Sequence, residues 1–229
     1  MGLGLLKESD WNVTCKRHVA FMDIMGFKEL VAKKSHGDVL EILESLSAVS
    51  QIAKLFSGTT FKVSDNSIFE ERIRTVTFSD TIMFFSTDDS IADLKMIVNC
   101  CQGFHMGCCV KQEPVPIKGS ISTGLITADL EKSLFFGQPI IDAYQLQEQV
   151  HYYGIVADHS IDHMLHETEG LDNLVRCKTP LKGGSILHYN MRFDVDPDDL
   201  NKFYNTVSGQ VRKYVDNTLD MYKLMHPDD

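Results

Sequence analysis

The sequence predicts one α+β domain in which helices cover a mostly antiparallel sheet. The chain has 229 residues, room for one large domain or two small ones, and it is 43% hydrophobic and 24% charged, as in ordinary globular proteins with a sizeable core. Alternating apolar runs that predict strands are interspersed with stretches of helical spacing. No internal repeat or low-complexity linker divides the chain. Together these features favour a single domain over residues 1–229.

The first half of the chain contains four expected features. Residues 18–24 (HVAFMDI) are a short apolar run that predicts a buried strand, and Met25, Gly26 and Phe27 predict a tight turn after it. Apolar residues at helical spacing follow to about residue 56, with Gly37 marking a break between two helices. Residues 72–86 alternate on both sides of a Ser-Asp pair, which predicts a β-hairpin with that pair at its tip.

The second half continues with short strands and helices. We expect helices over residues 90–110, 140–152 and 160–167, and strands over residues 117–125, 133–136, 154–158, 175–178 and 185–190. A long C-terminal helix is predicted over about residues 198–225. The expected order is therefore β-αα-ββ-α-ββ-α-β-α-ββ-α, which is typical of an α+β domain.

Charge and composition exclude several classes of function. The net charge is -10 and no basic tract stands out, so we expect no binding to nucleic acid. No apolar run approaches the roughly 20 residues that span a bilayer, and the first ten residues are too short and mixed for a signal peptide. The six cysteines are therefore expected to be reduced, in a cytoplasmic protein that does not bind membranes.

Two aspartates occur in apolar surroundings at the ends of predicted strands. Asp23 follows Met22 directly, and Asp80 lies between Phe78 and Ile82. A carboxylate is costly to bury unless something pairs with it, and hard oxygen ligands suit Mg2+ or Mn2+ held jointly with phosphates. Two such ions can activate a hydroxyl and stabilise a leaving pyrophosphate. The alternative is that Asp23 caps the following helix and Asp80 is an ordinary turn residue.

Several segments together resemble a known family. The pair FMDIMGF (residues 21–27) and TFSDTIMFF (residues 77–85) is similar to the two metal-binding segments of class III nucleotide cyclases. The resemblance continues with KGSISTG (118–124), FFGQPIIDAYQLQE (135–148) and PLKGG (180–184), and so covers residues 19–189. It implies a class III nucleotidyl cyclase-like, ferredoxin-like sheet covered by helices. No single segment is specific, but the ordered set is.

Within this superfamily the chain most resembles the Pycsar cyclases, bacterial antiphage enzymes that make cyclic pyrimidine nucleotides. Adenylate cyclases carry a base-reading Lys where this chain has Val76, and an Asp where it has Leu134. Neither aliphatic side chain can make the hydrogen bonds that read adenine. The resemblance therefore implies a uridylate or cytidylate cyclase, with UTP favoured over CTP, that makes a 3',5'-cyclic second messenger and pyrophosphate.

The resemblance also implies which residues form the site. It assigns two Mn2+ or Mg2+ ions per site to Asp23, Ile24 and Asp80, and catalysis to Asp23, Asp80, Lys182 and Arg74. Lys182 matches the family's triphosphate lysine, and Arg74 shares strand parity with Asp80. The expected substrate-binding residues are Phe21, Met25, Gly26, Phe27, Val76, Lys118 and Tyr144.

Two departures from the family keep an alternative open. Ile141 and Gln145 stand where the family has an Asn and an Arg that hold the ribose and the transition-state charge. Because positioned charge is usually the largest catalytic contribution, their loss favours a non-catalytic cyclase-like domain that binds a nucleotide or a partner. In either case the resemblance implies a head-to-tail homodimer. In it, the aspartates of one chain would face residues 137–145 of the other, in two shared active sites.

Overall fold

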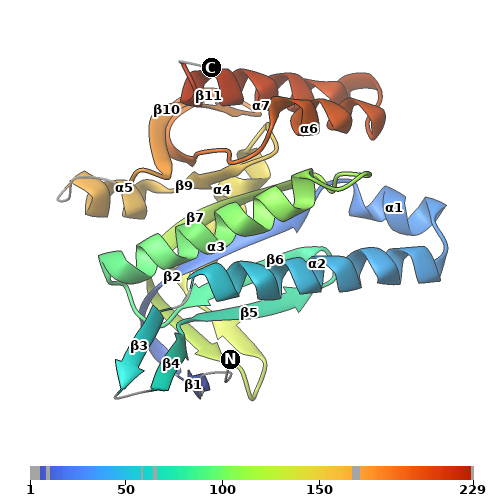
Figure 1. Ribbon diagram of the computed structural model, residues 1–229. Helices are drawn as coiled ribbons and strands as arrows, with labels where there is room; N and C mark the ends of the chain where they lie inside the picture. Colours follow the sequence, from blue (N-terminus) through green and yellow to red (C-terminus); the bar gives the residue numbers. More distant parts are fainter. Residues whose placement is uncertain (1–5, 9–10, 58, 64–65, 167–170, 228–229) are drawn as a thin grey trace.

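An eight-stranded sheet forms the centre of the protein (Figure 1). The computed structural model describes residues 6–8, 11–57, 59–63, 66–166 and 171–227. The strand order is β10-β11-β9-β7-β2-β6-β5, with β8 paired to β7, and the β7–β9 pair is parallel whereas the others are antiparallel. The strands are β2 (Thr14–Ile24), β5 (Ile73–Phe78), β6 (Thr81–Ser86), β7 (Ile117–Asp129), β8 (Leu134–Phe136), β9 (Ile155–Ala157), β10 (Leu174–Leu181) and β11 (Gly184–Met191). The predicted mostly antiparallel sheet is confirmed.

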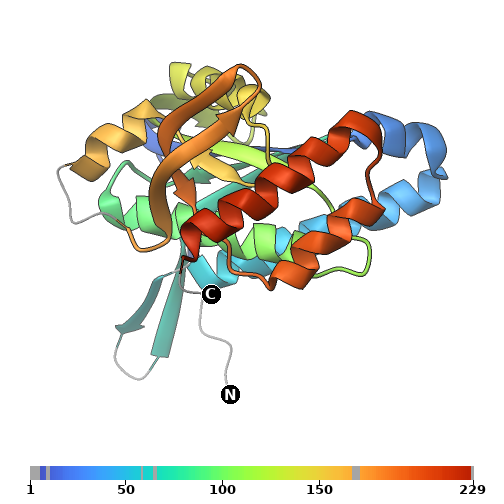
Figure 2. The ribbon, with the colours of Figure 1, turned by 90° about the horizontal axis from the view of Figure 1, so that it is seen from above.

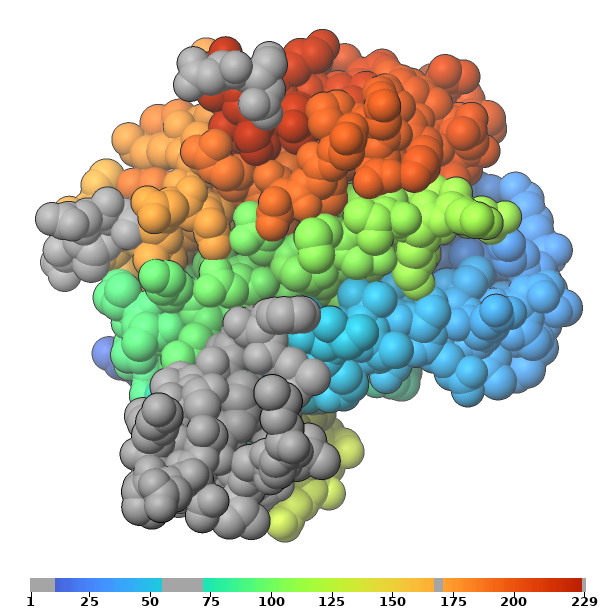
Figure 3. Space-filling model, viewed as in Figure 1, coloured from blue at the N-terminus to red at the C-terminus, as the bar shows by residue number. Residues whose placement is uncertain are grey.

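Strand β2 is buried because helices cover both faces of the sheet. Its residues Met22 and Ile24 pack in the same core cluster as residues of α2 (His36–Ser57) and α3 (Ile91–Cys109). On the other face Val19 and Phe21 pack with Ala143 of α4 (Gln138–Gln149). Since successive side chains of a strand point to opposite faces, Phe21 and Asp23 both belong to the α4 face. Figure 3 shows α2 and α3, in blue and green, side by side on the opposite face.

The break between the first two helices lies earlier than expected. Helix α1 spans Phe27–Lys33 and α2 begins at His36, so Gly37 lies inside α2 and does not separate the helices. Ser35 explains the position. The Asp38 amide donates to Ser35 Oγ at 3.2 Å, and the Ser35 amide donates to Asp38 Oδ2 at 3.1 Å. This reciprocal pair satisfies amide groups at a helix start, which favours beginning α2 directly after Ser35.

The hairpin and the helix after it agree with the sequence. Strands β5 and β6 meet at Ser79 and Asp80, and Ser79 takes the left-handed conformation with φ 57°. Helix α3 begins after Ser90, whose hydroxyl accepts a hydrogen bond from the Asp93 amide at 3.2 Å. Helix α5 (His159–His166) also lies where a helix was expected.

The C-terminal helix is broken, contrary to the single helix predicted over residues 198–225. The structure has α6 (Pro197–Asn201), 3-10 turns over Lys202–Asn205 and Gly209–Val211, and then α7 (Arg212–Met225). Gly209 has φ 59°, outside the helical region, which reverses the chain. Leu200, Phe203 and Val215 then share one buried cluster, so α6 folds back on α7 (Figure 2). Burial of these three side chains explains why two short helices form in place of one.

A small second sheet was not predicted. Strands β1 (Leu6–Glu8), β4 (Asn66–Glu71) and β3 (Thr59–Val63) pair in that order, with β1 parallel to β4. It extends below the main sheet in Figure 1. In the part of the chain that the structure describes, no helix is long and apolar enough to cross a bilayer.

Candidate active site

The structure brings Asp23 and Asp80 together. The tip of the β5–β6 hairpin is joined to the end of β2, because the Ile24 amide donates to the Asp80 carbonyl oxygen at 3.1 Å. Asp23 is also paired with Thr81, the residue after Asp80, across the β2–β6 ladder. Two carboxylates that are 57 positions apart in the sequence therefore lie at the same end of the sheet.

The two carboxylates are close enough for the charge of Asp80 to affect the ionisation of Asp23. Burial raises the pKa of Asp23 to about 6, and the negative charge of Asp80 contributes to the increase. Glu148 adds to it, whereas the positive charge of Lys118 opposes it. Two repelling carboxylates in a partly desolvated site are stabilised by a cation, and their oxygen ligands are those that Mg2+ and Mn2+ prefer.

The remaining predicted metal ligand is Ile24. Its side chain packs in the core on the α2 and α3 face, so only its main-chain carbonyl oxygen is suitable as a ligand. Among the described residues, no group of three or more His, Cys, Asp or Glu side chains is arranged to hold a metal ion. The residues present therefore fit ions held by two carboxylates and completed by phosphate oxygens and water.

The turn after β2 excludes the capping interpretation of Asp23. Helix α1 has Gly26 as its N-cap residue, and no side chain makes a capping hydrogen bond there. Gly26 has φ 75°, a conformation that favours glycine, and this lets the chain pass from β2 directly into α1. The Met25 amide donates to the Pro116 carbonyl oxygen at 2.8 Å, and Phe27 packs against the main core. Met25, Gly26 and Phe27 thus lie directly beside the two aspartates.

Two lysines are near the same carboxylates. Lys118 on β7 is the register partner of Asp23 and is only 2% exposed. Its ammonium group donates to the Glu148 carbonyl oxygen at 3.4 Å. Burial lowers the pKa of Lys118, and the positive charge of Lys182 lowers it further. Lys182 follows β10, and its Nζ lies 3.9 Å from Glu148 Oε2. Carboxylates for a cation and ammonium groups for phosphates therefore meet in one place.

Helix α4 presents Tyr144 beside this site. Ser120 Oγ donates to the Ala143 carbonyl oxygen at 2.6 Å, which holds α4 on β7. The Tyr144 ring then meets the Phe21 ring edge to face, with centroids 5.6 Å apart. Tyr144 is 49% exposed, so half of its surface remains available to a ligand or to another chain. Val76 lies in the same apolar cluster as Phe21, on the α4 face of the sheet.

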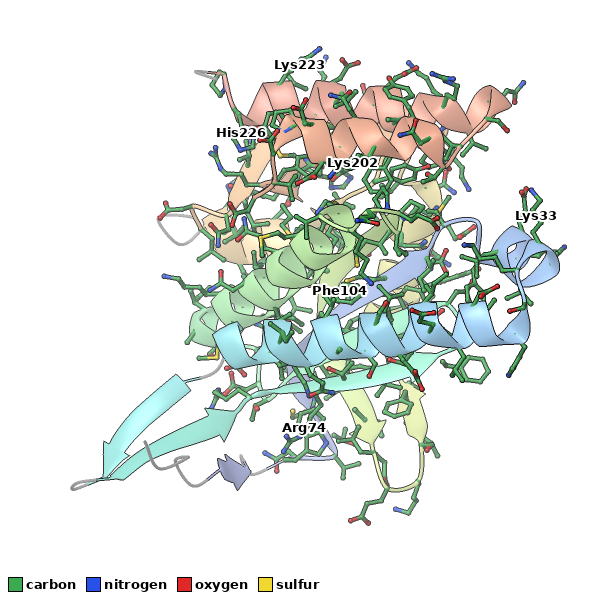
Figure 4. All side chains as sticks on the ribbon, turned by 45° about the vertical axis from the view of Figure 1, so that its right-hand side comes forward. Lys33, Arg74, Phe104, Lys202, Lys223 and His226 are labelled. Atoms are coloured by element: carbon green, nitrogen blue, oxygen red, sulfur yellow. The ribbon has the colours of Figure 1, made fainter. Side chains whose placement is uncertain are left out.

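Arg74 is not brought to the two aspartates. Its guanidinium carbon lies 5.8 Å from the centre of the Trp11 ring, and its register partner is Phe85. Arg74 precedes Phe78, at the hairpin tip, by four positions, which is about 13 Å of extended chain. Figure 4 shows Arg74 below the sheet, away from α1. Strand parity put it on the predicted face, but at the other end of the strand.

Glu148 is a residue that the sequence analysis did not assign to the site. It contacts both lysines and raises the pKa of Asp23. It was part of the motif at residues 135–148, yet only the positions up to Gln145 carry a family role. Its position in the last turn of α4, the helix that packs on β7, could have identified Glu148 as a site residue.

Comparison with known proteins identifies the fold. No protein-family model and no curated protein sequence matches this chain. Solved structures do match. One is the catalytic core of a rhodopsin-guanylyl cyclase with converted specificity, in complex with ATPαS. It has a TM-score of 0.57 and 16% identity over 78% of this chain and 96% of that one.

Two further matches are of the same kind. The adenylyl cyclase CyaB from P. aeruginosa has a TM-score of 0.52 and 16% identity, over 78% of this chain and 94% of its own. The non-canonical dimeric guanylyl cyclase domain of the RhoGC fusion protein from the aquatic fungus Blastocladiella emersonii has a TM-score of 0.58. It is 13% identical, over 76% of this chain and 93% of its own. At these identities the likeness concerns the fold, and the predicted class III cyclase-like α+β fold is confirmed.

Proposed function

We propose that this chain is a nucleotide cyclase that converts a pyrimidine triphosphate, UTP ahead of CTP, into its 3',5'-cyclic monophosphate and pyrophosphate. The observation that carries the proposal is the meeting of Asp23 and Asp80 on a cyclase fold, with Lys118 and Lys182 next to them. The product would act in the cytoplasm as a second messenger in antiphage defence, as the resemblance to Pycsar cyclases implies.

The reaction requires few groups from the protein. The ribose 3'-oxygen attacks the α-phosphorus, the bond to the oxygen between the α- and β-phosphorus breaks, and pyrophosphate leaves while the 3'-hydroxyl proton is lost. Two bound Mn2+ or Mg2+ ions would lower the pKa of that hydroxyl and neutralise charge on the phosphates. Asp23, Asp80 and the Ile24 carbonyl would hold these ions. Lys118 and Lys182 would bind the β- and γ-phosphates and stabilise the negative charge that develops on pyrophosphate.

The choice of a pyrimidine base rests on Val76 and Leu134, which stand where adenylate cyclases carry their base-reading residues. Val76 is part of an apolar cluster, and Leu134 is 46% exposed, so neither position offers a hydrogen-bonding group to adenine. A base held in apolar surroundings of this kind would be bound through stacking and shape. Bulky aliphatic and aromatic side chains would favour a one-ring base over a two-ring base.

Exposed apolar side chains on α4 support a homodimer with shared sites. Ile141 and Tyr144 of this helix are 48% and 49% exposed. Exposed apolar groups of this kind mark interaction surfaces. In the proposed head-to-tail dimer, Asp23 and Asp80 of one chain would face residues 137–145 of the other, and the same surface would be used twice.

The alternative is a cyclase-like domain that binds a nucleotide without reacting it. Ile141 is 48% exposed on α4 and Gln145 is exposed beside it, so the positions of the family's Asn and Arg are on the surface but lack their chemistry. The two retained aspartates argue against this alternative. Paired carboxylates in apolar surroundings are suited to the two metal ions of catalysis, which a site without chemistry does not need.

The decisive experiment is incubation of the protein with each of the four nucleoside triphosphates and Mn2+, followed by chromatography of the products. We expect cyclic UMP and pyrophosphate from UTP, with a smaller yield from CTP. A preference for ATP would contradict the pyrimidine assignment. Binding of UTP without any product would favour the non-catalytic alternative, and open-chain products would indicate a phosphatase or nuclease.

A further inference from the structure

Residues 148–153 comprise the end of α4 and the short stretch after it. Two elements that each carry a lysine of the proposed phosphate site contact these residues. From β7, Lys118 Nζ donates to the Glu148 carbonyl oxygen at 3.4 Å. From the turn after β10, the Lys182 amide donates to the Gln149 carbonyl oxygen at 2.8 Å. The His151 amide donates to the Pro180 carbonyl oxygen of β10 at 2.9 Å. The stretch is thus a common support for both lysines.

Helix α7 is attached to the same stretch. Asn217 Nδ2 donates to the His151 carbonyl oxygen at 2.6 Å, and the Tyr153 amide donates to Thr218 Oγ1 at 2.8 Å. The Tyr214 ring meets the His151 ring edge to face, with centroids 4.3 Å apart. Asn217 and Thr218 are buried, so the first half of α7 is held firmly against the stretch. Lys213, in the first turn of α7, is exposed next to Tyr214.

The first turn of α7 brings Lys213 into the neighbourhood of His151, because Lys213 directly precedes Tyr214, whose ring contacts the His151 ring. Burial lowers the pKa of His151, and the positive charges of Lys182, Lys213 and Lys118 lower it further. This direction agrees with the contacts that place all three lysines on elements touching residues 148–153. Within the described ranges no carboxylate lies within ion-pair distance of Lys213. Among the described residues, Lys182 is paired with Glu148, and Lys118 is influenced by the charges of Glu148 and Asp23, whereas Lys213 makes no such ion pair.

We propose that Lys213 is a third phosphate-binding residue, which with Lys118 and Lys182 forms one cationic site around His151 for the terminal phosphates of the nucleotide and for pyrophosphate. This proposal rests on the proposed function, because it names further ligand contacts of the same site. Lys118 is the register partner of Asp23, the Lys182 amide binds the Gln149 carbonyl oxygen, and Lys213 lies on the helix that holds His151. A triphosphate whose α-phosphate lies at the two aspartates would reach these lysines with its terminal phosphates.

The C-terminal helix thereby gains a role in ligand binding. Figure 2 shows the C-terminal end of α7 beside the β10–β11 hairpin, and the first turn of the helix carries Lys213. A phosphate bound between Lys182 and Lys213 would connect the hairpin to the helix through charge-assisted hydrogen bonds, which are stronger than neutral ones. Lys213 would act by binding the ligand and not by supporting the fold, since its side chain is exposed.

Magnesium pyrophosphate is the probe that tests this site without any turnover. Its affinity is measured by titration calorimetry for the wild type, Lys213→Gln and the control Lys223→Gln. Lys223 is an exposed lysine near the other end of the same helix (Figure 4). We expect Lys213→Gln to weaken binding about tenfold, the loss of one charge-assisted contact. Lys223→Gln should leave the affinity unchanged, and Lys213→Arg should largely retain it.

Steady-state kinetics with UTP provide a second measurement. Lys213→Gln should raise KM and weaken product inhibition by pyrophosphate by a similar factor. Wild-type affinity for pyrophosphate in Lys213→Gln, or equal weakening in Lys223→Gln, would overturn the proposal, as would a wild-type protein that does not bind pyrophosphate. If no triphosphate is cyclised but pyrophosphate binding still depends on Lys213, the anion site is correct and the proposed function is wrong.

Discussion

Asp23 on β2 and Lys118 on β7 are direct partners in the antiparallel ladder at the centre of the sheet. Both side chains belong to the face that α4 covers, and Lys118 is almost fully buried. The charge of Lys118 partly offsets the effects that raise the pKa of Asp23. Asp23 belongs to the part of the site that can bind metal ions, and Lys118 belongs to the part that can bind phosphates. Their pairing in the sheet therefore places these two parts side by side.

The first prediction concerns the stability of the metal-free protein. Asp23→Asn should stabilise it at pH 8 by about 1 kcal/mol, a value reduced from the full pKa shift because the side chain is partly screened by solvent. The folded pKa of about 6 is above the unfolded value near 3.8. Between these two pKa values the native state therefore binds more protons than the unfolded chain. As a result, the free energy of unfolding of the wild type falls as the pH rises through this range.

Urea unfolding in EDTA at several pH values measures this effect. The free energy of unfolding should be the same for Asp23→Asn and the wild type near pH 4. The difference between them should grow between about pH 4 and 6 and stay constant above that range. A difference that is equally large at pH 4 and pH 8 would show that the asparagine acts by packing and not by removing a repelled charge.

The second prediction is competition between protons and metal at Asp23. A divalent ion requires the carboxylate, so the Mn2+ concentration for half-maximal thermal stabilisation should rise as the pH falls below about 6. Thermal unfolding with increasing Mn2+ at pH 5 and pH 7.5 measures it. Asp80→Asn removes the second carboxylate and should weaken Mn2+ binding at both pH values. If Mn2+ stabilises the wild type equally at both, Asp23 is not a ligand.

The two aspartates were accessible to sequence reasoning because each lies at the end of a local pattern. Alternation around Ser79 and Asp80 predicted the hairpin, and the apolar run before Asp23 predicted the strand. The lysine cluster was not accessible in the same way. Lys213 reaches the site only because Gly209 interrupts the helical pattern and because buried Asn217 binds the His151 carbonyl oxygen. Such long-range contacts leave no local period in the sequence.

The same reasoning explains the misplacement of Arg74. Strand parity determines the face of a sheet but not the position along the strand relative to a site. The correct face was predicted, yet Arg74 lies beside Trp11 near the far end of β5. The broken C-terminal helix has a similar origin, since the packing of Phe203 with Val215 is a tertiary contact that helical spacing cannot reveal.

The third prediction concerns Gly119, where β7 passes closest to β2. A Cβ atom there would lie 2.7 Å from the Phe21 carbonyl oxygen and from Met22 Cγ. Gly119→Ala should therefore push the two strands apart next to Lys118 and lower the free energy of unfolding by about 1–3 kcal/mol. Gly183→Ala is the control, because it lies beside Lys182 but a Cβ there meets nothing within 4 Å. Urea midpoints compare the two, and equal midpoints would contradict the steric argument.

The last prediction tests whether active sites are shared between chains. Asp80→Ala should abolish turnover, because it removes one metal carboxylate, and Tyr144→Ala should nearly abolish it by removing the exposed ring of α4. If Asp80 of one chain works with α4 of the other, a dimer of the two variants has one intact site. Equal mixing with free exchange makes half of the dimers mixed, so about a quarter of wild-type activity should return.

Asp23→Ala mixed with Asp80→Ala is the matched control for this complementation. Both changes affect the carboxylate half of the site, so every mixed dimer carries one lesion in each site and no activity should return. Activity is measured as pyrophosphate release, after subunit exchange has been verified by light scattering on chains of different tagged mass. Recovery in the control pair would show that the two aspartates act from different chains, and a fully active monomer would exclude shared sites. Recovery in the control pair would conflict with the hydrogen bond between the Ile24 amide and the Asp80 carbonyl oxygen, because this bond holds the two carboxylates of one chain together.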